Sequence, residues 1–323
     1  MRLIQTLILT CLPLGVQAGT VDVLDRHILP GYARFAEATS ALATATDRCD
    51  VSVMRPAYNE AFDAWLGISH IQLGPIEDRG LTLAIAFWPD PKDRAGKTLR
   101  GLVVDQDPIA EDADAYETMS VAARGFMAME RMLYDPPEGE ADYICALTTT
   151  IAADLATSAQ VLTEDWVQFA DLMRAPGDGN TRFLSEQEVE RALFTSLSTG
   201  LAFLQDQRLG RPLGTFDRPR PLRAEARRSG RSLRNIDLSL VALRDLADTL
   251  SGGEAADALA QFDAAIERAA SIDDPDLSGV ANPGGRIRIE ALSQSVSNLR
   301  QAVAFDIGER LGVKAGFNSL DGD

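Results

Sequence analysis

The chain has 323 residues, of which 46% are hydrophobic and 24% charged, and its formal net charge is −17. This composition is too apolar for a disordered chain and too charged for a protein with several membrane spans. The acidic charge repels phosphate backbones, which argues against a nucleic-acid partner. The length predicts two domains or one large domain.

The first 18 residues are predicted to be a secretory signal peptide. Arg2 precedes an apolar stretch over 3–12, and Val16-Gln17-Ala18 offers the small residues of a cleavage site. Cleavage after Ala18 predicts a periplasmic protein and leaves attachment to the envelope open. It would change the net charge from −17 to −18, because it removes one arginine and no acid. Beyond it, we expect no membrane span.

The cysteines predict one disulfide. The chain has three cysteines, and Cys11 lies in the predicted signal peptide. Cys49 and Cys145 would then remain in a chain sent to an oxidising compartment, where a bridge between them is the natural hypothesis. Two separate buried thiols are the alternative.

The rest of the chain is predicted to be all-α, because alanine and leucine dominate and β-branched alternation is scarce. Ser185 and Glu188 form a capping box at the start of one helix. Helices are predicted over 21–46, 56–73, 97–103, 111–134, 142–173, 185–207, 232–250, 255–270 and 286–311.

The spacing of these helices predicts two packed helical bundles, an N-terminal one over 19–177 and a C-terminal one over 178–323. The prolines and glycines of 76–108 predict a long irregular loop within the first bundle. The apolar run over 81–88 inside that loop fits a strand, a buried loop or the start of a helix. The segment 208–230 is predicted to be an arginine- and proline-rich connector.

Four stretches resemble the imelysin family. They are Ala84–Pro91, Trp65 with Leu73-Gly74-Pro75, Arg228–Asn235 and Gly316–Asp323. The resemblance implies two α-helical bundles with a cleft between them, in an exported protein with a link to iron uptake. It also implies a metallopeptidase classification, which rests on a Gly-x-His-x-x-Glu motif.

That motif falls on Gly125 to Glu130, with Met127 in place of the histidine. Residues at i and i+3 share a helix face, so a histidine and a glutamate at this spacing could hold one metal. A thioether is a poor ligand for zinc or iron and suits copper(I) instead. The substitution therefore argues against the family's metal site and against peptidase activity.

Histidine is scarce, with only His27 and His70 in the whole chain. A zinc hydrolase needs about three protein ligands, so a histidine-rich zinc site is excluded. His27 is expected at the surface, near Asp22 and Asp25. His70 is either a polar residue hydrogen-bonded at a helix end, or a cleft ligand or proton donor.

Glu130 is the main candidate for a functional side chain. It follows Met127 and Met129 on an apolar helix, and a buried carboxylate is costly unless it is paired or bound to a metal. One interpretation is a cleft carboxylate that binds a metal or pairs with a cleft arginine. The other is a structural ion pair, for example with Arg124, Arg131 or an arginine from the later helix.

Further candidates lie in the irregular loop and the connector. Trp88 and Asp90 are expected to line the cleft, although Trp88 could equally plug the core. Arg228, Arg231 and Ser232 suggest an anion pocket, because arginine forks bind carboxylates and phosphates. The alternative is a solvated connector that neutralises nearby acids.

These observations favour an exported, non-enzymatic binding or accessory protein linked to iron uptake. Its partner would be a metal ion, a metal complex or another envelope protein held in the cleft, with iron or another divalent metal as the expected cofactor. The alternatives are an imelysin-type metallopeptidase and an envelope scaffold without a metal.

Overall fold

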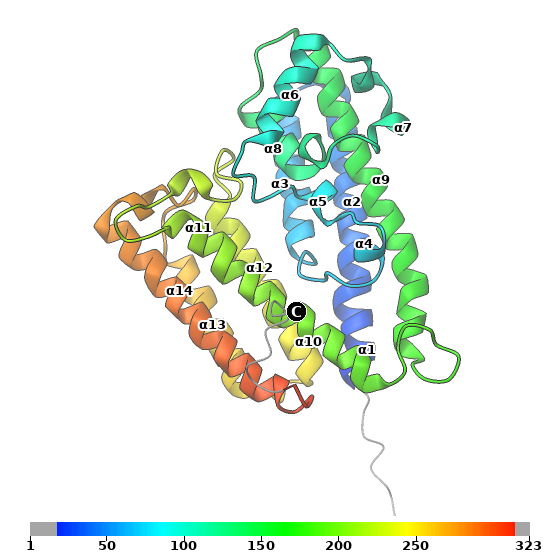
Figure 1. Ribbon diagram of the computed structural model, residues 1–323, viewed down its shortest axis with the longest axis vertical. Helices are drawn as coiled ribbons and strands as arrows, with labels where there is room; N and C mark the ends of the chain where they lie inside the picture. Colours follow the sequence, from blue (N-terminus) through cyan, green and yellow to red (C-terminus); the bar gives the residue numbers. More distant parts are fainter. Residues whose placement is uncertain (1–17, 314–323) are drawn as a thin grey trace, which may run out of the picture.

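The computed structural model describes residues 18–313, and it is all-α as predicted (Figure 1). Among these residues there is no strand, only an isolated bridge between Thr215 and Arg218. The predicted signal segment up to residue 17 and the family-like stretch over 316–323 lie outside the described residues.

The first bundle packs four main helices against one another. They are α2 (Leu29–Ala45), α3 (Val51–Leu66), α8 (Gly125–Tyr134) and α9 (Ala141–Arg174). The chain enters through α1 (Ala18–Asp22) and the π-helical segment η1 (Val23–Ile28). The short helices of this half are α4 (Pro75–Asp78), α5 (Thr82–Ile85), α6 (Arg94–Asp105) and α7 (Ala113–Tyr116), with 3₁₀ turns η2 (Thr46–Arg48), η3 (Pro108–Glu111) and η4 (Val121–Ala123).

The second bundle also has four main helices. They are α10 (Glu186–Phe203), α12 (Ser232–Ser251), α13 (Ala256–Ala270) and α14 (Pro283–Val303). The π-helical η5 (Leu204–Leu209) and α11 (Gly210–Leu213) extend α10, and the π-helical η8 (Ala304–Gly308) extends α14. The 3₁₀ turns are η6 (Pro221–Arg223) and η7 (Ser278–Ala281). The division at 177/178 falls in the loop between α9 and α10, and its exact position stays a prediction.

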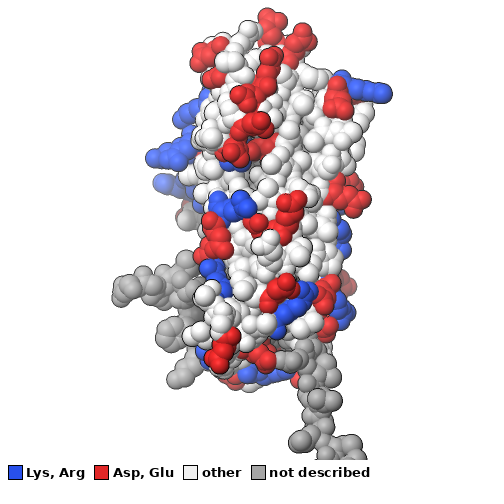
Figure 2. Space-filling model, turned by 90° about the vertical axis from the view of Figure 1, so that its right-hand side faces the viewer, with Lys and Arg blue, Asp and Glu red and all other residues white. Residues whose placement is uncertain are grey.

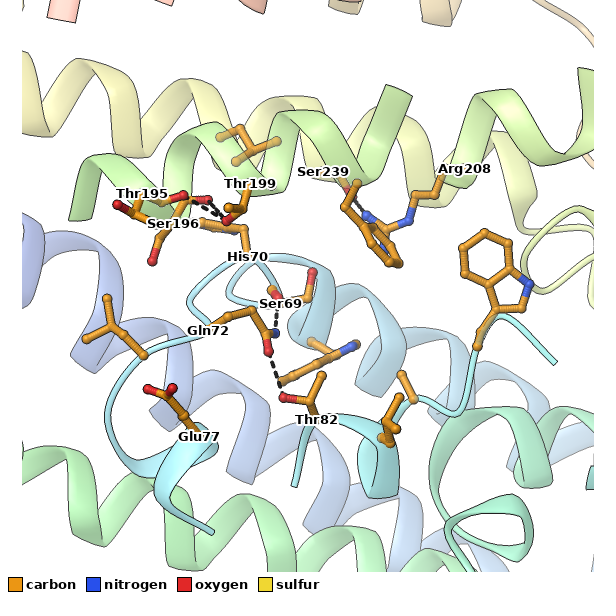
Figure 3. Close-up of a pocket in the computed structure, with 18 of the residues that line it drawn as sticks. Ser69, His70, Gln72, Glu77, Thr82, Thr195, Ser196, Thr199, Arg208 and Ser239 are labelled. Atoms are coloured by element: carbon orange, nitrogen blue, oxygen red, sulfur yellow. Dashed lines mark hydrogen bonds between the residues drawn. The ribbon is translucent and has the colours of Figure 1, made fainter. Parts of the chain in front are cut away.

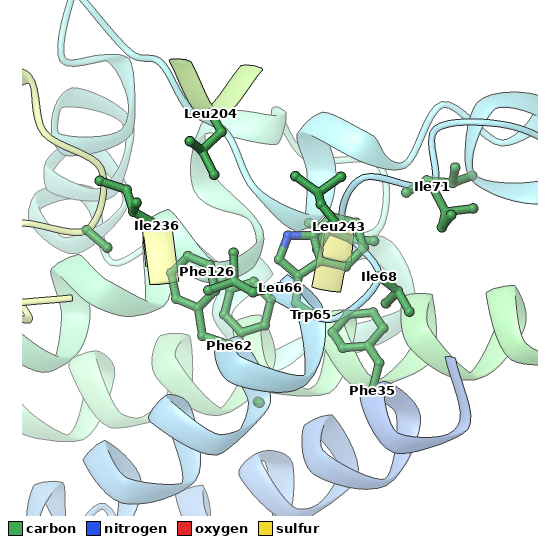
Figure 4. Close-up of a cluster of buried hydrophobic side chains, with 14 of the residues drawn as sticks. Phe35, Phe62, Trp65, Leu66, Ile68, Ile71, Phe126, Leu204, Ile236 and Leu243 are labelled. Carbon is green, nitrogen blue, oxygen red and sulfur yellow. The ribbon is translucent and has the colours of Figure 1, made fainter. Parts of the chain in front are cut away.

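An apolar contact joins the two bundles. Figure 4 shows Phe62 and Trp65 of α3 and Phe126 of α8 close to Leu204, Ile236 and Leu243 of the second bundle. All six side chains are buried, and each contributes about 2 kcal/mol through removal from water. The contact fixes the bundles relative to each other and so defines the spaces between them.

The predicted disulfide is confirmed. Cys49 and Cys145 are bonded, with Cα atoms 5.6 Å apart. The bridge ties the turn between α2 and α3 to α9, and it closes a loop with a sequence separation of 96 residues. A covalent loop of this length restricts the unfolded chain and stabilises the fold by about 3–5 kcal/mol.

One described helix, α9, is long and apolar enough to cross a membrane by length and composition. We had expected no such helix from the sequence. Half of its most apolar window is buried. It packs against α2 and α8, and Trp166 on it stacks on Tyr32. The central helix of a helical bundle has this same length and composition.

Most predicted helices are present, but three predictions were wrong in detail. The single helix over 111–134 is instead the short helix α7, the 3₁₀ turn η4 and the helix α8. Gly125, with a φ of +67°, separates η4 from α8. The helix over 56–73 runs from Val51 to Leu66, since Asp50 caps it and Pro56 is tolerated inside it. The segment 208–230 is partly helical rather than only a connector.

Two π-helical segments precede prolines. Pro30 follows η1 and Pro212 follows η5. A proline ring clashes with the carbonyl four residues before it, and a widened turn relieves that clash. Each π-helical segment carries one buried polar side chain. His27 lies on η1 and Arg208 on η5, and both are buried between the bundles.

The acidic charge of the protein is unevenly distributed. On the face in Figure 2, acidic side chains gather at the end formed by α6 and α7, and acidic and basic side chains are scattered over the rest of the face. Exposed acids in that end region include Asp105, Glu111, Asp112, Asp114 and Glu117. The arginine-rich segment after η5 therefore lies in a protein that is otherwise negative.

Candidate functional site

A polar cavity of about 360 Å³ lies between the loop after α5, helix α8 and the segment before α12. Five of the residues singled out in the sequence line this cavity: Trp88, Asp90, Met127, Glu130 and Arg228. They are up to 140 positions apart in sequence, and the fold brings them to one place.

Gly125 places α8 against this cavity without lining it. Its φ of +67° is open to glycine and rarely adopted by other residues. A Cβ there would lie 2.1 Å from the carbonyl oxygen of Ile85. The glycine therefore allows the loop that carries Trp88 to cross directly over the start of α8.

Glu130 is 2% exposed, and its bonds differ from the predicted ion pairs. The backbone N–H and the hydroxyl of Ser229 both donate to Oε1, at 2.9 and 2.8 Å. Burial raises the pKa of the carboxyl, against the lowering effect of Ser229 and of Arg228 and Arg227. The second oxygen, Oε2, has no hydrogen-bond partner among the described residues, so it is the atom left to meet a ligand.

The predicted structural partners of Glu130 are engaged elsewhere. Arg124 forms a bidentate ion pair with Asp154, at 2.7 and 2.8 Å. Arg131 pairs with Asp93. Glu130 is therefore not held by either arginine.

The lining of the cavity has more arginines than carboxylates, and Asp135, which does not line it, pairs with Arg228 at 2.9 Å. Five arginines line the cavity against three carboxylates: Arg131, Arg211, Arg223, Arg227 and Arg228 against Asp90, Asp93 and Glu130. Burial, followed by the neighbouring Arg223, lowers the pKa of Arg211. Burial, followed by Arg228, lowers the pKa of Arg131. Positive charges crowded in this way favour an anionic ligand.

Two buried polar atoms at this cavity have no hydrogen-bond partner within residues 18–313. They are Nε of Arg211 and Oδ1 of Asp90. The other oxygen of Asp90 accepts from the backbone N–H of Ala95 at 2.9 Å, which folds the loop back on itself. Buried polar atoms are nearly always paired, so the two orphans point to a bound molecule or water at this position.

Arg231 and Ser232 lie outside this cavity. Arg231 pairs with Asp63, donates to Asn59 at 3.0 Å and lies 5.0 Å from the centre of the Phe62 ring. Ser232 donates to the backbone carbonyl of Glu225 at 2.6 Å. Both residues join the segment before α12 to its surroundings.

His70 lies in a second cavity of about 580 Å³, which shares Trp88 with the first. Figure 3 shows His70 between the first bundle and the serine and threonine side chains of α10. The surface position expected for His27 was wrong, because His27 is 3% exposed and its Nε2 lies 2.9 Å from Nε2 of His70. The π turn of η1 directs it into the contact between the bundles.

A resident metal does not fit the first cavity. The motif histidine is replaced by Met127, and Glu130 is the one motif ligand that remains. Among residues 18–313, no group of three or more His, Cys, Asp or Glu side chains is placed to hold a metal ion. Zinc and iron sites in proteins need such a group.

Comparison with known proteins identifies the family. A family model described as Imelysin matches residues 28–303. The chain belongs to the imelysin family. No curated protein matches it.

Two solved structures share the imelysin fold of this chain. An imelysin-like protein from Psychrobacter arcticum 273-4 has a TM-score of 0.75 at 19% identity, covering 92% of this chain and 96% of its own. A protein described as an iron-regulated protein A precursor, from Parabacteroides distasonis ATCC 8503, has a TM-score of 0.74 at 14% identity, covering 90% of this chain and 93% of its own. At these identities the likeness shows the fold alone.

Several residues of the site were missed by sequence reasoning. Ser229 lies one position from the predicted Arg228, and Arg211, Arg223 and Arg227 were treated as part of the connector. The nine arginines over 208–234 were the one feature of the sequence that pointed to these residues. They did not show which arginines turn inward, because that depends on how the segment before α12 folds against α8.

Proposed function

We propose that this imelysin-family chain is an exported, non-enzymatic binding protein of iron uptake, and that its polar cavity binds a metal held by an anionic chelator. The single observation that supports this proposal most is the lining of five arginines against three carboxylates, in a chain with a net charge of −17. A bare cation would be repelled by such a lining, whereas a ferric complex of a polycarboxylate would be attracted.

The roles of the residues follow from their contacts. Arg211, with its unpartnered Nε, would donate to carboxylate oxygens of the complex. Glu130 would meet the complex through Oε2, since Oε1 is occupied by Ser229. Trp88 would form an apolar wall. The protein would thus recognise the chelator as well as the metal.

The test is a calorimetric titration of the purified protein with ferric citrate, and with citrate alone. We expect one-to-one binding of ferric citrate, weakened about tenfold or more in Arg211→Ala, because a charge-assisted bond of this kind contributes about 1.5–3 kcal/mol. Arg268→Ala is the matched control, since Arg268 is exposed and bonds to Ser295 on the far bundle. It should bind ferric citrate like the wild type.

Two outcomes would overturn the proposal. Cleavage of an unfolded protein substrate that a chelator abolishes would support a metallopeptidase instead. An absence of both binding and cleavage would support a scaffold for another envelope protein.

A further inference from the structure

The second cavity differs from the first in its chemistry. Its walls are mainly apolar, with Trp65, Trp88, Phe203 and Leu243 among the lining residues. Its volume of about 580 Å³ lies within the range of small-molecule sites. It lies between α10 and the loop that follows α3 (Figure 3).

The charged groups of this cavity do not favour an anion. Arg208 and Glu225 are both buried, and they pair through Nε and Oε2 at 2.7 Å. The second arm of Arg208 donates to Ser239 at 2.7 Å. Glu77 is the remaining charged lining residue, and its side chain is 64% exposed. The interior of the cavity therefore suits a neutral molecule.

A chain of three side chains ends at this cavity. Nδ1 of His27 lies 2.5 Å from Oδ2 of Asp245, and Nε2 of His27 lies 2.9 Å from Nε2 of His70. The hydrogen bond from His27 lowers the pKa of Asp245, so Asp245 is a carboxylate that accepts. Burial lowers the pKa of His70 well below 6.5, so His70 is neutral.

The order of these bonds fixes the tautomers when both rings are neutral. Asp245 can only accept, so His27 carries its proton on Nδ1 and its Nε2 is an acceptor. His70 must then donate from Nε2. Its Nδ1 is left with a lone pair and no hydrogen-bond partner among the described residues. His70 is 6% exposed and lines the cavity, so this lone pair is the acceptor that His70 can offer to a molecule inside.

We propose that this cavity is a second binding site, for a neutral molecule with an aromatic or other apolar body and one hydroxyl or N–H group that donates to Nδ1 of His70. The apolar walls bind the body, and the Asp245–His27–His70 chain selects the donor. The site is separate from the arginine-lined cavity, although Trp88 borders both.

The test uses two probes that share a body and differ in the donor, 1-naphthol and 1-methoxynaphthalene, titrated calorimetrically at about pH 7.5, where His70 is neutral. We expect the wild type to bind 1-naphthol at one-to-one stoichiometry and about tenfold or more tightly than the ether, because the ether leaves the buried acceptor unpaired.

Two variants locate the binding. His70→Phe keeps a ring of similar size and removes the acceptor, so the two probes should then bind within about twofold of each other. Ala192→Phe, on the cavity-lining side of α10, should weaken both probes about tenfold or more by filling the space. Melting curves check that each variant is folded, and the Ala192→Phe result stands even if His70→Phe fails to fold.

The proposal is contradicted if the wild type binds the two probes equally, or binds neither. It is also contradicted if Ala192→Phe, correctly folded, binds both probes like the wild type. Glu130→Gln should not change the affinity for 1-naphthol, which separates this site from the proposed iron-complex site.

Discussion

The two cavities between the bundles lie side by side and share Trp88, yet they have opposite chemistry. The cavity at Glu130 is lined by arginines with unsatisfied buried polar atoms, whereas the cavity at His70 is apolar and its one arginine is neutralised by Glu225. The two proposals would place a site for an anion next to a site for a neutral molecule at one contact between the bundles.

The difference arises from where each arginine finds its partner. Arg208, on the π-helical segment η5, donates hydrogen bonds to Glu225 and Ser239, both at 2.7 Å. In the part of the chain that the structure describes, Arg211, one turn later, donates one hydrogen bond, to Gln207 at 3.3 Å, and lies 5.9 Å from the centre of the Trp88 ring. Three positions along the chain thus separate Arg208, whose charge is neutralised by Glu225, from Arg211, whose guanidinium is available to a ligand.

The largest expected effect tests the ion pair of Arg208 and Glu225 at the His70 cavity. Glu225→Gln leaves Arg208 buried without a counter-charge and should lower the free energy of unfolding by about 3–5 kcal/mol, measured by urea denaturation. Asp263→Asn is the matched control, because it breaks the exposed ion pair with Arg244 and should cost less than about 1 kcal/mol. Similar losses in the two variants would contradict the account of Arg208.

The next prediction concerns the wall of the arginine-lined cavity. Gly125→Ala places a Cβ 2.1 Å from a carbonyl oxygen at a φ of +67°. We expect a loss of about 2–4 kcal/mol in the free energy of unfolding, through backbone strain and displacement of the loop. Gly101→Ala, on α6 where a Cβ would meet nothing within 4 Å, should be neutral or slightly stabilising. A tolerated Gly125→Ala would show that the loop can move away from α8.

The pH dependence of the free energy of unfolding tests the burial of His70 in the second cavity. Because burial lowers the pKa of His70, the unfolded chain binds a proton below about pH 6.5 that the native chain does not. Stability should therefore fall as pH drops below about 6.5, by up to ~1.4 kcal/mol per pH unit. His27, Arg208 and Asp245 surround this group.

Mutation of His70 tests whether this residue causes the change in the free energy of unfolding with pH. His70→Phe should remove it, as seen in urea denaturation at several pH values. An unchanged slope in a folded His70→Phe protein would place the titration elsewhere.

The smallest expected change is the stability of Glu130→Gln. Burial raises the pKa of Glu130, so its ionised form opposes folding at neutral pH, and this cost declines as pH falls toward about 4.5. Glutamine keeps an oxygen to accept from Ser229. The melting temperature should stay the same or rise slightly, by the equivalent of about 1 kcal/mol or less. A loss above about 2 kcal/mol would indicate a structural role for the carboxylate instead.

Much of the fold could be predicted from the sequence. Helix periodicity and the capping box at Ser185 gave α9, α10, α12 and α13 to within a few residues. The export hypothesis left two cysteines to pair, and they do. The division of 111–134 into α7, η4 and α8 could not be predicted, because no proline or glycine precedes Gly125 in this region to mark the breaks.

The site could be predicted only in part. The motif around Glu130 and the stretch with Trp88 and Asp90 identified residues that do share a cavity. The partner of Glu130 is Ser229, 99 positions away, and no local pattern links them. The contact between His27 and His70 likewise depends on a π turn and a tertiary contact.

The most direct measurement of the central claim, two independent sites of opposite chemistry, is a set of titrations with ferric citrate and with 1-naphthol. The account predicts that Arg211→Ala weakens ferric citrate about tenfold or more and leaves 1-naphthol unchanged, while Ala192→Phe does the reverse. If both variants weaken both ligands equally, or if neither ligand binds the wild type, the claim is contradicted.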